Sequence, residues 1–155
     1  MSDSALIPTQ ETVLGTMQLL YGESVAVTET SDADQCIFAV YVSDDDVPLA
    51  AAWCDISFGA YAGASLTRIP KGGADDAAMS GELPTPIYDN LREVMNILAS
   101  LFMSDKTPHL RLGTVYPDMS DVPDEEKAMF EGKSGSSFTV EVPNYGKGNV
   151  QMVIT

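Results

Sequence analysis

Two apolar segments, residues 35–43 and 48–58, constrain the fold of this chain more than any other feature of its sequence. The first is nearly continuous in apolar side chains, which is the pattern of a strand buried on both of its faces. The second is also strand-like and carries the single tryptophan, Trp53. Between them, Asp44-Asp45-Asp46 indicates a solvated turn, because this acidic run lacks the spaced ligands and the glycine of a calcium loop. The first strand is therefore expected inside a sheet that is covered on both faces.

The remaining segments predict helices and further strands around this pair. Residues 9–21 have the pattern of an amphipathic helix, with Thr9 as its cap and Gly22 after its end. The strongest helix covers residues 87–103, with Thr85 and Pro86 as cap and first residue. The other expected elements are a strand at 24–30, a helix of small residues at 59–67, a loop at 71–84, a strand at 109–116, a short helix at 123–131 and a terminal hairpin of 137–142 and 149–155 around Gly146 and Gly148. Strands clustered between helices predict an α+β fold, with a largely antiparallel sheet and long helices packed on it, in a single domain covering residues 1–155.

Charge excludes several classes of partner. The formal net charge is −15, and residues 1–67 hold ten acids and no Lys or Arg. Such a chain has no general means of neutralising a phosphate backbone, so nucleic acid is not an expected partner. Anionic membrane surfaces should repel it as well. The acidic N-terminal part is interpreted as a solvating surface, and an acidic face for a basic partner is the alternative.

The sequence predicts a cytoplasmic location. Its first residues lack the basic and apolar regions of a signal peptide, and the longest apolar run, 36–42, is far shorter than a bilayer span. Cys36 and Cys54 lie in apolar, strand-like surroundings and are interpreted as buried reduced thiols. A disulfide between them is the alternative.

Several catalytic and metal-binding motifs fail on inspection. Gly132-Lys133-Ser134 resembles the end of a P-loop, but Lys127 stands where a glycine is required and no buried strand precedes it. The single histidine, His109, has no second histidine or cysteine at ligand spacing, so no metal site is expected. No Gly-x-Ser-x-Gly sequence supplies a nucleophilic serine. We therefore interpret His109 as structural.

The helix at 87–103 has one polar row that stands out. At 100° per residue its apolar side chains fall on one broad face. Four polar residues lie on the opposite face, within roughly 40° of the direction of the first of them. They are Asp89, Glu93, Asn96 and Ser100. A polar face is ordinary in an amphipathic helix. Asn96 is less ordinary, because asparagine is mildly unfavourable inside helices.

The spacing Asp89-x3-Glu93-x2-Asn96, followed after twenty residues by Pro117, resembles the active-site helix of the CheC/CheX/FliY phosphatases of bacterial chemotaxis. The context is also similar, since a strand and a small-residue helix precede this helix and a strand follows it. Two departures are the spacing to Pro117, which is about twenty-two in the family, and Met95, where the family often has glycine. Because the chain has one such helix, it is closest to single-site CheX-like proteins.

The resemblance implies a function and a set of site residues. The substrate would be the aspartyl phosphate of a CheY-type response regulator in chemotaxis or two-component signalling. Asn96 would orient the attacking water, Glu93 would pair with the regulator's lysine, and Asp89 and Ser100 would contact the partner. The chain would need no cofactor of its own, since Mg²⁺ belongs to the regulator, and a homodimer is implied.

Two alternatives to the phosphatase remain open. The chain is a non-catalytic CheX-like scaffold or interaction module in bacterial signalling, or it is an unrelated acidic α+β domain in which the spacing is accidental. Glu93 and Asn96 favour the phosphatase, because a scaffold has no need to keep them.

Overall fold

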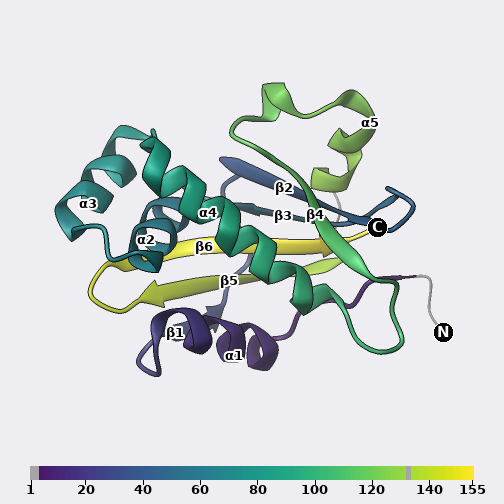
Figure 1. Ribbon diagram of the computed structural model, residues 1–155, viewed down its shortest axis with the longest axis horizontal. Helices are drawn as coiled ribbons and strands as arrows, with labels where there is room; N and C mark the ends of the chain where they lie inside the picture. Colours follow the sequence, from purple (N-terminus) through teal and green to yellow (C-terminus); the bar gives the residue numbers. More distant parts are fainter. Residues whose placement is uncertain (1–3, 132–133) are drawn as a thin grey trace.

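The strands of the chain form one sheet in which every neighbouring pair is antiparallel (Figure 1). The computed structural model describes residues 4–131 and 134–155. Within these residues the sheet has six strands in the order β1-β5-β6-β3-β2-β4. Their bounds are β1 Ala26–Glu29, β2 Ile37–Ser43, β3 Pro48–Cys54, β4 Leu110–Tyr116, β5 Gly135–Val142 and β6 Gly146–Ile154. The expected α+β fold with a largely antiparallel sheet is confirmed.

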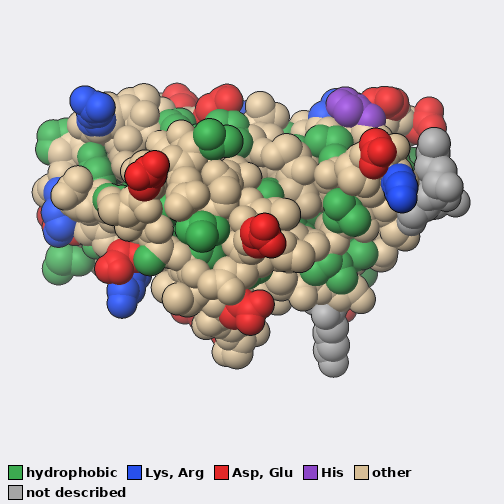
Figure 2. Space-filling view, turned by 90° about the horizontal axis from the view of Figure 1, so that it is seen from below, with side chains coloured by type: hydrophobic (Ala, Val, Ile, Leu, Met, Phe, Trp, Pro, Cys, Tyr) green, Lys and Arg blue, Asp and Glu red, His purple; other side chains and the backbone are tan. Residues whose placement is uncertain are grey.

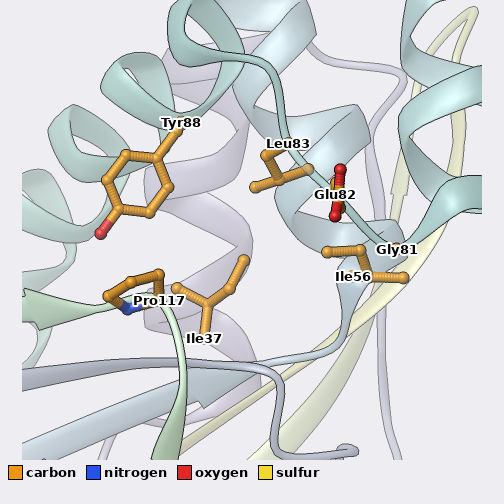
Figure 3. Close-up of a pocket in the computed structure, with 7 residues that line it drawn as sticks. All are labelled: Ile37, Ile56, Gly81, Glu82, Leu83, Tyr88 and Pro117. Carbon is orange, nitrogen blue, oxygen red and sulfur yellow. The ribbon is translucent and has the colours of Figure 1, made fainter. Parts of the chain in front are cut away.

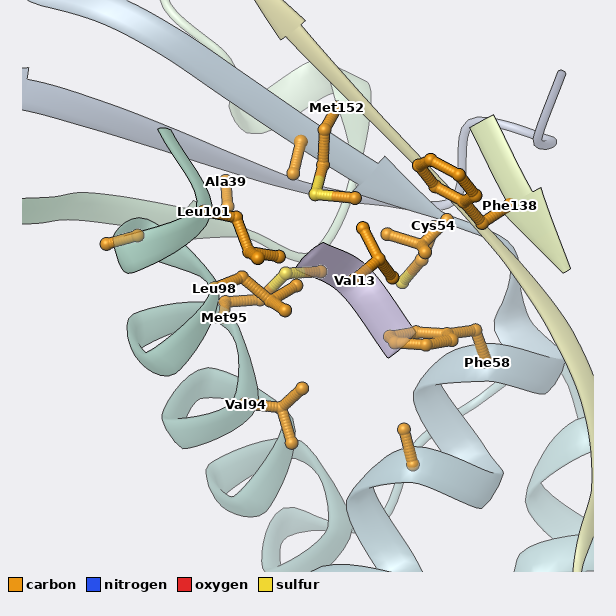
Figure 4. Packing of buried hydrophobic residues seen from close by; sticks show 14 of the residues in the cluster. Val13, Ala39, Cys54, Phe58, Val94, Met95, Leu98, Leu101, Phe138 and Met152 are labelled. Carbon is orange, nitrogen blue, oxygen red and sulfur yellow. The ribbon is translucent and has the colours of Figure 1, made fainter. Parts of the chain in front are cut away.

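Helices cover one face of the sheet and a shorter segment covers part of the other. The helices are α1 Gln10–Tyr21, α2 Ile56–Leu66, α3 Lys71–Ser80, α4 Thr85–Leu98 and α5 Asp124–Lys127, with 3-10 turns at Ala99–Phe102, Met119–Asp121 and Ala128–Glu131. Side chains from α1, α2 and α4 meet the sheet in the larger core (Figure 4). On the opposite face, Phe130 packs edge-on against Phe38 and Trp53, with ring centroids 4.9 and 5.9 Å away. Strand β2 is therefore buried on both faces, as its sequence predicts.

The segment at 48–58 is not one strand. Strand β3 ends at Cys54, and Asp55 begins helix α2. The Oδ1 atom of Asp55 accepts hydrogen bonds from the backbone N–H groups of Phe58, at 2.8 Å, and Asn149, at 3.1 Å. An aspartate at this position is a strong helix start, so the apolar residues after it continue into the helix rather than the strand. Burial raises the pKa of the Asp55 carboxyl, although both hydrogen bonds lower it.

A helix, α3, occupies most of the segment expected to be a loop. Gly72 and Gly73 made a loop the natural prediction, because glycine weakens helices. Tertiary packing outweighs this preference, since Ala74 and Ala77 are buried against α2 and α4. Gly81 closes the helix in the left-handed conformation, with φ of 79°.

Two further details differ from the prediction. Helix α4 has Pro84 rather than Thr85 at its N-cap, and no side chain caps it there. The turn of the terminal hairpin lies at Asn144, whose φ is 68°, while Gly146 and Gly148 belong to β6. Thr9 caps α1 as predicted. The residues Gly132 and Lys133 of the rejected P-loop pattern lie outside the described residues.

The two cysteines are free thiols. Cys54 is fully buried and Cys36 is half-buried, so the expectation of reduced thiols is confirmed and that of full burial holds only for Cys54. Burial raises the pKa of both. Across the described part of the chain, no helix combines the length and apolar character needed to cross a bilayer.

Acidic side chains are scattered on the face seen in Figure 2, which looks at the molecule from below the view of Figure 1. The basic side chains on this face lie toward its two ends. Because the acids do not gather into one patch here, this face fits the interpretation of the acidic excess as a solvating surface.

Close helix packing positions α4. A Cβ atom added to Gly63 of α2 would lie 2.6 Å from the carbonyl oxygen of Ile87, so the two helices meet where α2 has no side chain. On the next turn the Asn90 amide donates hydrogen bonds to the carbonyl of Gly63, at 2.9 Å, and to the hydroxyl of Thr67, at 2.7 Å. At the other side of α4, the pairing of β2 with β4 shifts register and leaves Gly113 without an opposite residue.

Glycine substitutions should have opposite effects in two parts of this fold. A Cβ atom at Gly148 would overlap the backbone of Phe58, so Gly148→Ala should destabilise the protein by about 1–3 kcal/mol or more. Gly15, on the exposed side of α1, has nothing within 4 Å of the added Cβ atom. Gly15→Ala should therefore stabilise the protein by about 0.5–1 kcal/mol. Urea unfolding followed by Trp53 fluorescence measures both, and a Gly148→Ala protein as stable as wild type would contradict this packing.

Candidate active site on helix α4

Helix α4 separates into a buried face and an exposed face. Its buried residues are Ile87, Leu91, Val94, Met95 and Leu98. The four residues of the polar row, Asp89, Glu93, Asn96 and Ser100, are all exposed. The helix expected to reach residue 103 ends at Leu98, so Ser100 lies in the 3-10 turn that follows it. The core therefore takes one side of the helix, and the row of polar side chains lies on the side that solvent or a partner can reach.

Three of the four predicted residues share a shallow hollow. Asp89, Glu93 and Asn96 line it together with Arg92 and Leu112, and its volume is about 320 Å³. Ser100 is not among the lining residues. Its hydroxyl donates to the carbonyl of Ile97 at 3.0 Å, a bond within its own helical turn.

The polar groups in the hollow are not engaged elsewhere in the described part of the chain. The side chains of Asp89, Arg92, Glu93 and Asn96 form no hydrogen bond and no ion pair there. Other polar side chains of the same helix are engaged, since Asn90 bonds to α2. The hollow thus presents a carboxamide, two carboxylates and a guanidinium that are free to bind a ligand.

A buried tyrosine fixes the helix just before Asn96. The hydroxyl of Tyr41, on β2, donates to the carbonyl of Met95 at 2.6 Å, and the Tyr41 side chain is fully buried. Burial raises the pKa of this hydroxyl well above its usual range, so it stays protonated as a donor. After Leu98 the helix tightens, and the Ala99 N–H bonds to the carbonyl of Asn96 rather than to that of Met95. The backbone around Asn96 is therefore held from both sides.

Pro117 does not lie in the hollow. It lines a separate pocket at the start of α4, with Tyr88 and Leu83 among its neighbours (Figure 3). Strand β4 runs back along α4, so the residue that follows it lies near Tyr88 rather than near Asn96. The residues of the sequence pattern therefore lie in two places: Asp89, Glu93 and Asn96 line the hollow, and Pro117 lines the pocket at the start of α4.

Sequence reasoning missed two residues of the hollow. Arg92 lies only about 60° from Asp89 around the helix, so the same rotation that selected the polar row also indicated this residue. Leu112 comes from β4, and its position depends on the register between β2 and β4. No local signal in the sequence carries that register.

The histidine and the acidic turn lie away from this hollow. His109 is exposed, and its Nδ1 atom lies 2.9 Å from Oδ1 of Asp44. Arg111 pairs with Asp46 of the same turn. The three aspartates are exposed as predicted, and two of them also join the β2–β3 turn to the start of β4. Within the described residues, no group of three or more His, Cys, Asp or Glu side chains is arranged to hold a metal ion.

No family model, curated protein or solved structure matches this chain. Function therefore has to be inferred from the chemistry of the hollow and from the sequence pattern. A neutral carboxamide can hydrogen-bond a water molecule at any working pH, and a carboxylate beside it can pair with a cation of a partner. Among the described residues, no Ser or Cys lines the hollow to act as a nucleophile.

Removing the Tyr41 hydroxyl should weaken the support of the hollow. Tyr41→Phe leaves the buried Met95 carbonyl without this donor, so the free energy of unfolding should fall by about 1–3 kcal/mol. Tyr88→Phe is the matched control, because the Tyr88 hydroxyl makes only a long contact of 3.5 Å with the Val115 carbonyl. Its effect should stay below about 0.5 kcal/mol. Equal losses in the two variants, measured by urea unfolding, would contradict the role given to Tyr41.

Proposed function

We propose that this chain is a CheX-like phosphatase that hydrolyses the aspartyl phosphate of a CheY-type response regulator in chemotaxis or two-component signalling. The observation that carries the proposal is the pairing of Glu93 and Asn96, which are exposed, unengaged and three residues apart on a helix that is fixed from its buried side. The resemblance of their spacing to the CheC/CheX/FliY active-site helix supplies the substrate class. A cytoplasmic location and a homodimer belong to the same proposal.

Hydrolysis of an acyl phosphate depends mainly on positioning. The oxygen of a water molecule forms a bond to phosphorus as the bond from phosphorus to the aspartate oxygen breaks, which releases inorganic phosphate and the free carboxylate. The Asn96 carboxamide orients this water and stays neutral throughout. Glu93 pairs with the lysine of the regulator's site and so sets the register of the two proteins. Asp89 and Ser100 contact the partner on either side.

The chain contributes no nucleophile and no metal in this scheme. By the resemblance, Mg²⁺ would be held in the regulator's own phosphorylation site and would supply charge neutralisation there. Arg92, which lines the same hollow, adds a cation at the rim. Because Glu93 and Asn96 are both on α4, the rate should depend on how accurately this helix is held.

Substitutions in the hollow test the proposal. A panel of response regulators is phosphorylated with a small phosphodonor, and the loss of phosphate is followed with and without the protein. Asn96→Ala should slow dephosphorylation by about 100-fold, because the water loses its orientation. Glu93→Ala should lower kcat/KM by about tenfold or more, because docking is weakened.

Two residues in and just after α1 provide matched controls. Gln18→Ala removes an exposed carboxamide of α1, and Glu23→Ala removes an exposed carboxylate two residues after α1. Neither residue lines the hollow, so both variants should act like wild type. A panel in which wild type accelerates no regulator would refute the phosphatase. Binding of phosphorylated regulator without acceleration would instead favour the non-catalytic scaffold. Acceleration that survives Asn96→Ala would refute the mechanism.

A further inference from the structure

An apolar pocket opens at the start of α4, next to the hollow that holds Glu93 and Asn96 (Figure 3). Its volume is about 330 Å³. The apolar lining comes from four separate parts of the chain, namely Ile37 at the start of β2, Ile56 at the start of α2, Leu83 and Tyr88 around the start of α4, and Pro117 after β4. Ile37 is buried, while Ile56, Leu83 and Tyr88 are only half-buried. Apolar surface in the pocket is therefore accessible to a side chain of a partner. The space fits one large apolar side chain.

The surroundings of this pocket are acidic. Glu82 lines it and is exposed. Burial raises the pKa of the Tyr88 hydroxyl, and the charges of Asp121 and Asp89 add to this effect while Arg92 opposes it. Binding of a partner's side chain in this pocket would therefore be favoured if the partner had a lysine or arginine next to it. A second copy of this chain, with a net charge of −15, fits this acidic rim less well than a partner with a basic residue, so the proposed homodimer would use another surface.

Helix α4 places the pocket and the hollow next to each other. Tyr88 lines the pocket, and the next residue, Asp89, lines the hollow. Tyr88 and Asn96 are eight residues apart, which is about 12 Å along a helix. A folded partner whose phosphorylated site meets Asn96 would therefore also cover the pocket.

We infer that the pocket lined by Leu83, Tyr88 and Pro117 is the docking site for an apolar anchor side chain of the response regulator, flanked by a basic residue that pairs with Glu82. This inference rests on the proposed function for the identity of the partner. It assigns affinity and partner choice to the pocket, and chemistry to Glu93 and Asn96. A buried apolar anchor beside a polar site is a common way for an interface to gain affinity.

Binding to the regulator panel tests the inference apart from catalysis. Each regulator is held in its activated form with beryllofluoride, and its Kd is measured by calorimetry against wild type, Glu82→Lys and Leu83→Ala. Each variant should weaken binding by about tenfold. The effect of Glu82→Lys should shrink near about 0.5 M salt, where exposed charges are screened, and that of Leu83→Ala should persist.

Two control variants carry the same kinds of substitution at residues that do not line the pocket. Glu23→Lys is the same charge reversal at an exposed acid two residues after α1, and Leu19→Ala truncates a leucine that is 90% exposed. Both should bind like wild type. Urea unfolding checks that each variant is folded, and the exposed Glu82→Lys serves if Leu83→Ala is too unstable.

Each outcome separates the two proposals. Tight binding by wild type that neither pocket variant weakens overturns the docking pocket and leaves the phosphatase standing. Binding that the pocket variants weaken, without any dephosphorylation, supports the docking pocket and removes the phosphatase. Failure of every activated regulator to bind wild type overturns both.

Discussion

The hydrogen bond from Tyr41 to the Met95 carbonyl determines where helix α4 can lie. The apolar face of α4 is broad, so apolar contact alone would tolerate small rotations or shifts of the helix along the sheet. A buried hydroxyl has to be paired, and Tyr41 lies in an otherwise apolar core with Phe102 at a ring distance of 5.0 Å. One placement of the helix satisfies it. That placement also determines which way Glu93 and Asn96 face.

One side of α4 fixes the helix in place, and the other side carries the polar groups of the candidate site. On the inner side, Gly63 lets α2 approach closely and Asn90 joins the two helices by hydrogen bonds. On the outer side, the side chains of Asp89, Glu93 and Asn96 form no hydrogen bond or ion pair within the described residues that would have to break before a ligand binds. A site that works by positioning benefits from this division, because the groups are held in place without being occupied.

Features with a strong local pattern could be predicted from the sequence, and features that depend on distant contacts could not. The polar row of α4 follows from helical periodicity, and β2 from its unbroken apolar run. Helix α3 was missed because Gly72 and Gly73 oppose a helix locally, while the burial of Ala74 and Ala77 that stabilises it is tertiary. The hollow could not be predicted without knowing that Leu112 of β4 lines it. The position of Pro117 could not be predicted without knowing that β4 runs along α4. Both depend on strand pairing that no short segment encodes.

The register shift at Gly113 affects how another protein can approach this surface. Strand β4 is an edge of the sheet, and a regular edge strand would offer its backbone groups to any extended chain. An unopposed residue in the middle of the strand interrupts that row and increases the local twist. In the proposed complex, recognition beside α4 would therefore depend on side chains, whose contacts are selective and easily reversed. For the proposed phosphatase, which would release its regulator after each turnover, this interrupted edge would disfavour long-lived strand addition beside α4.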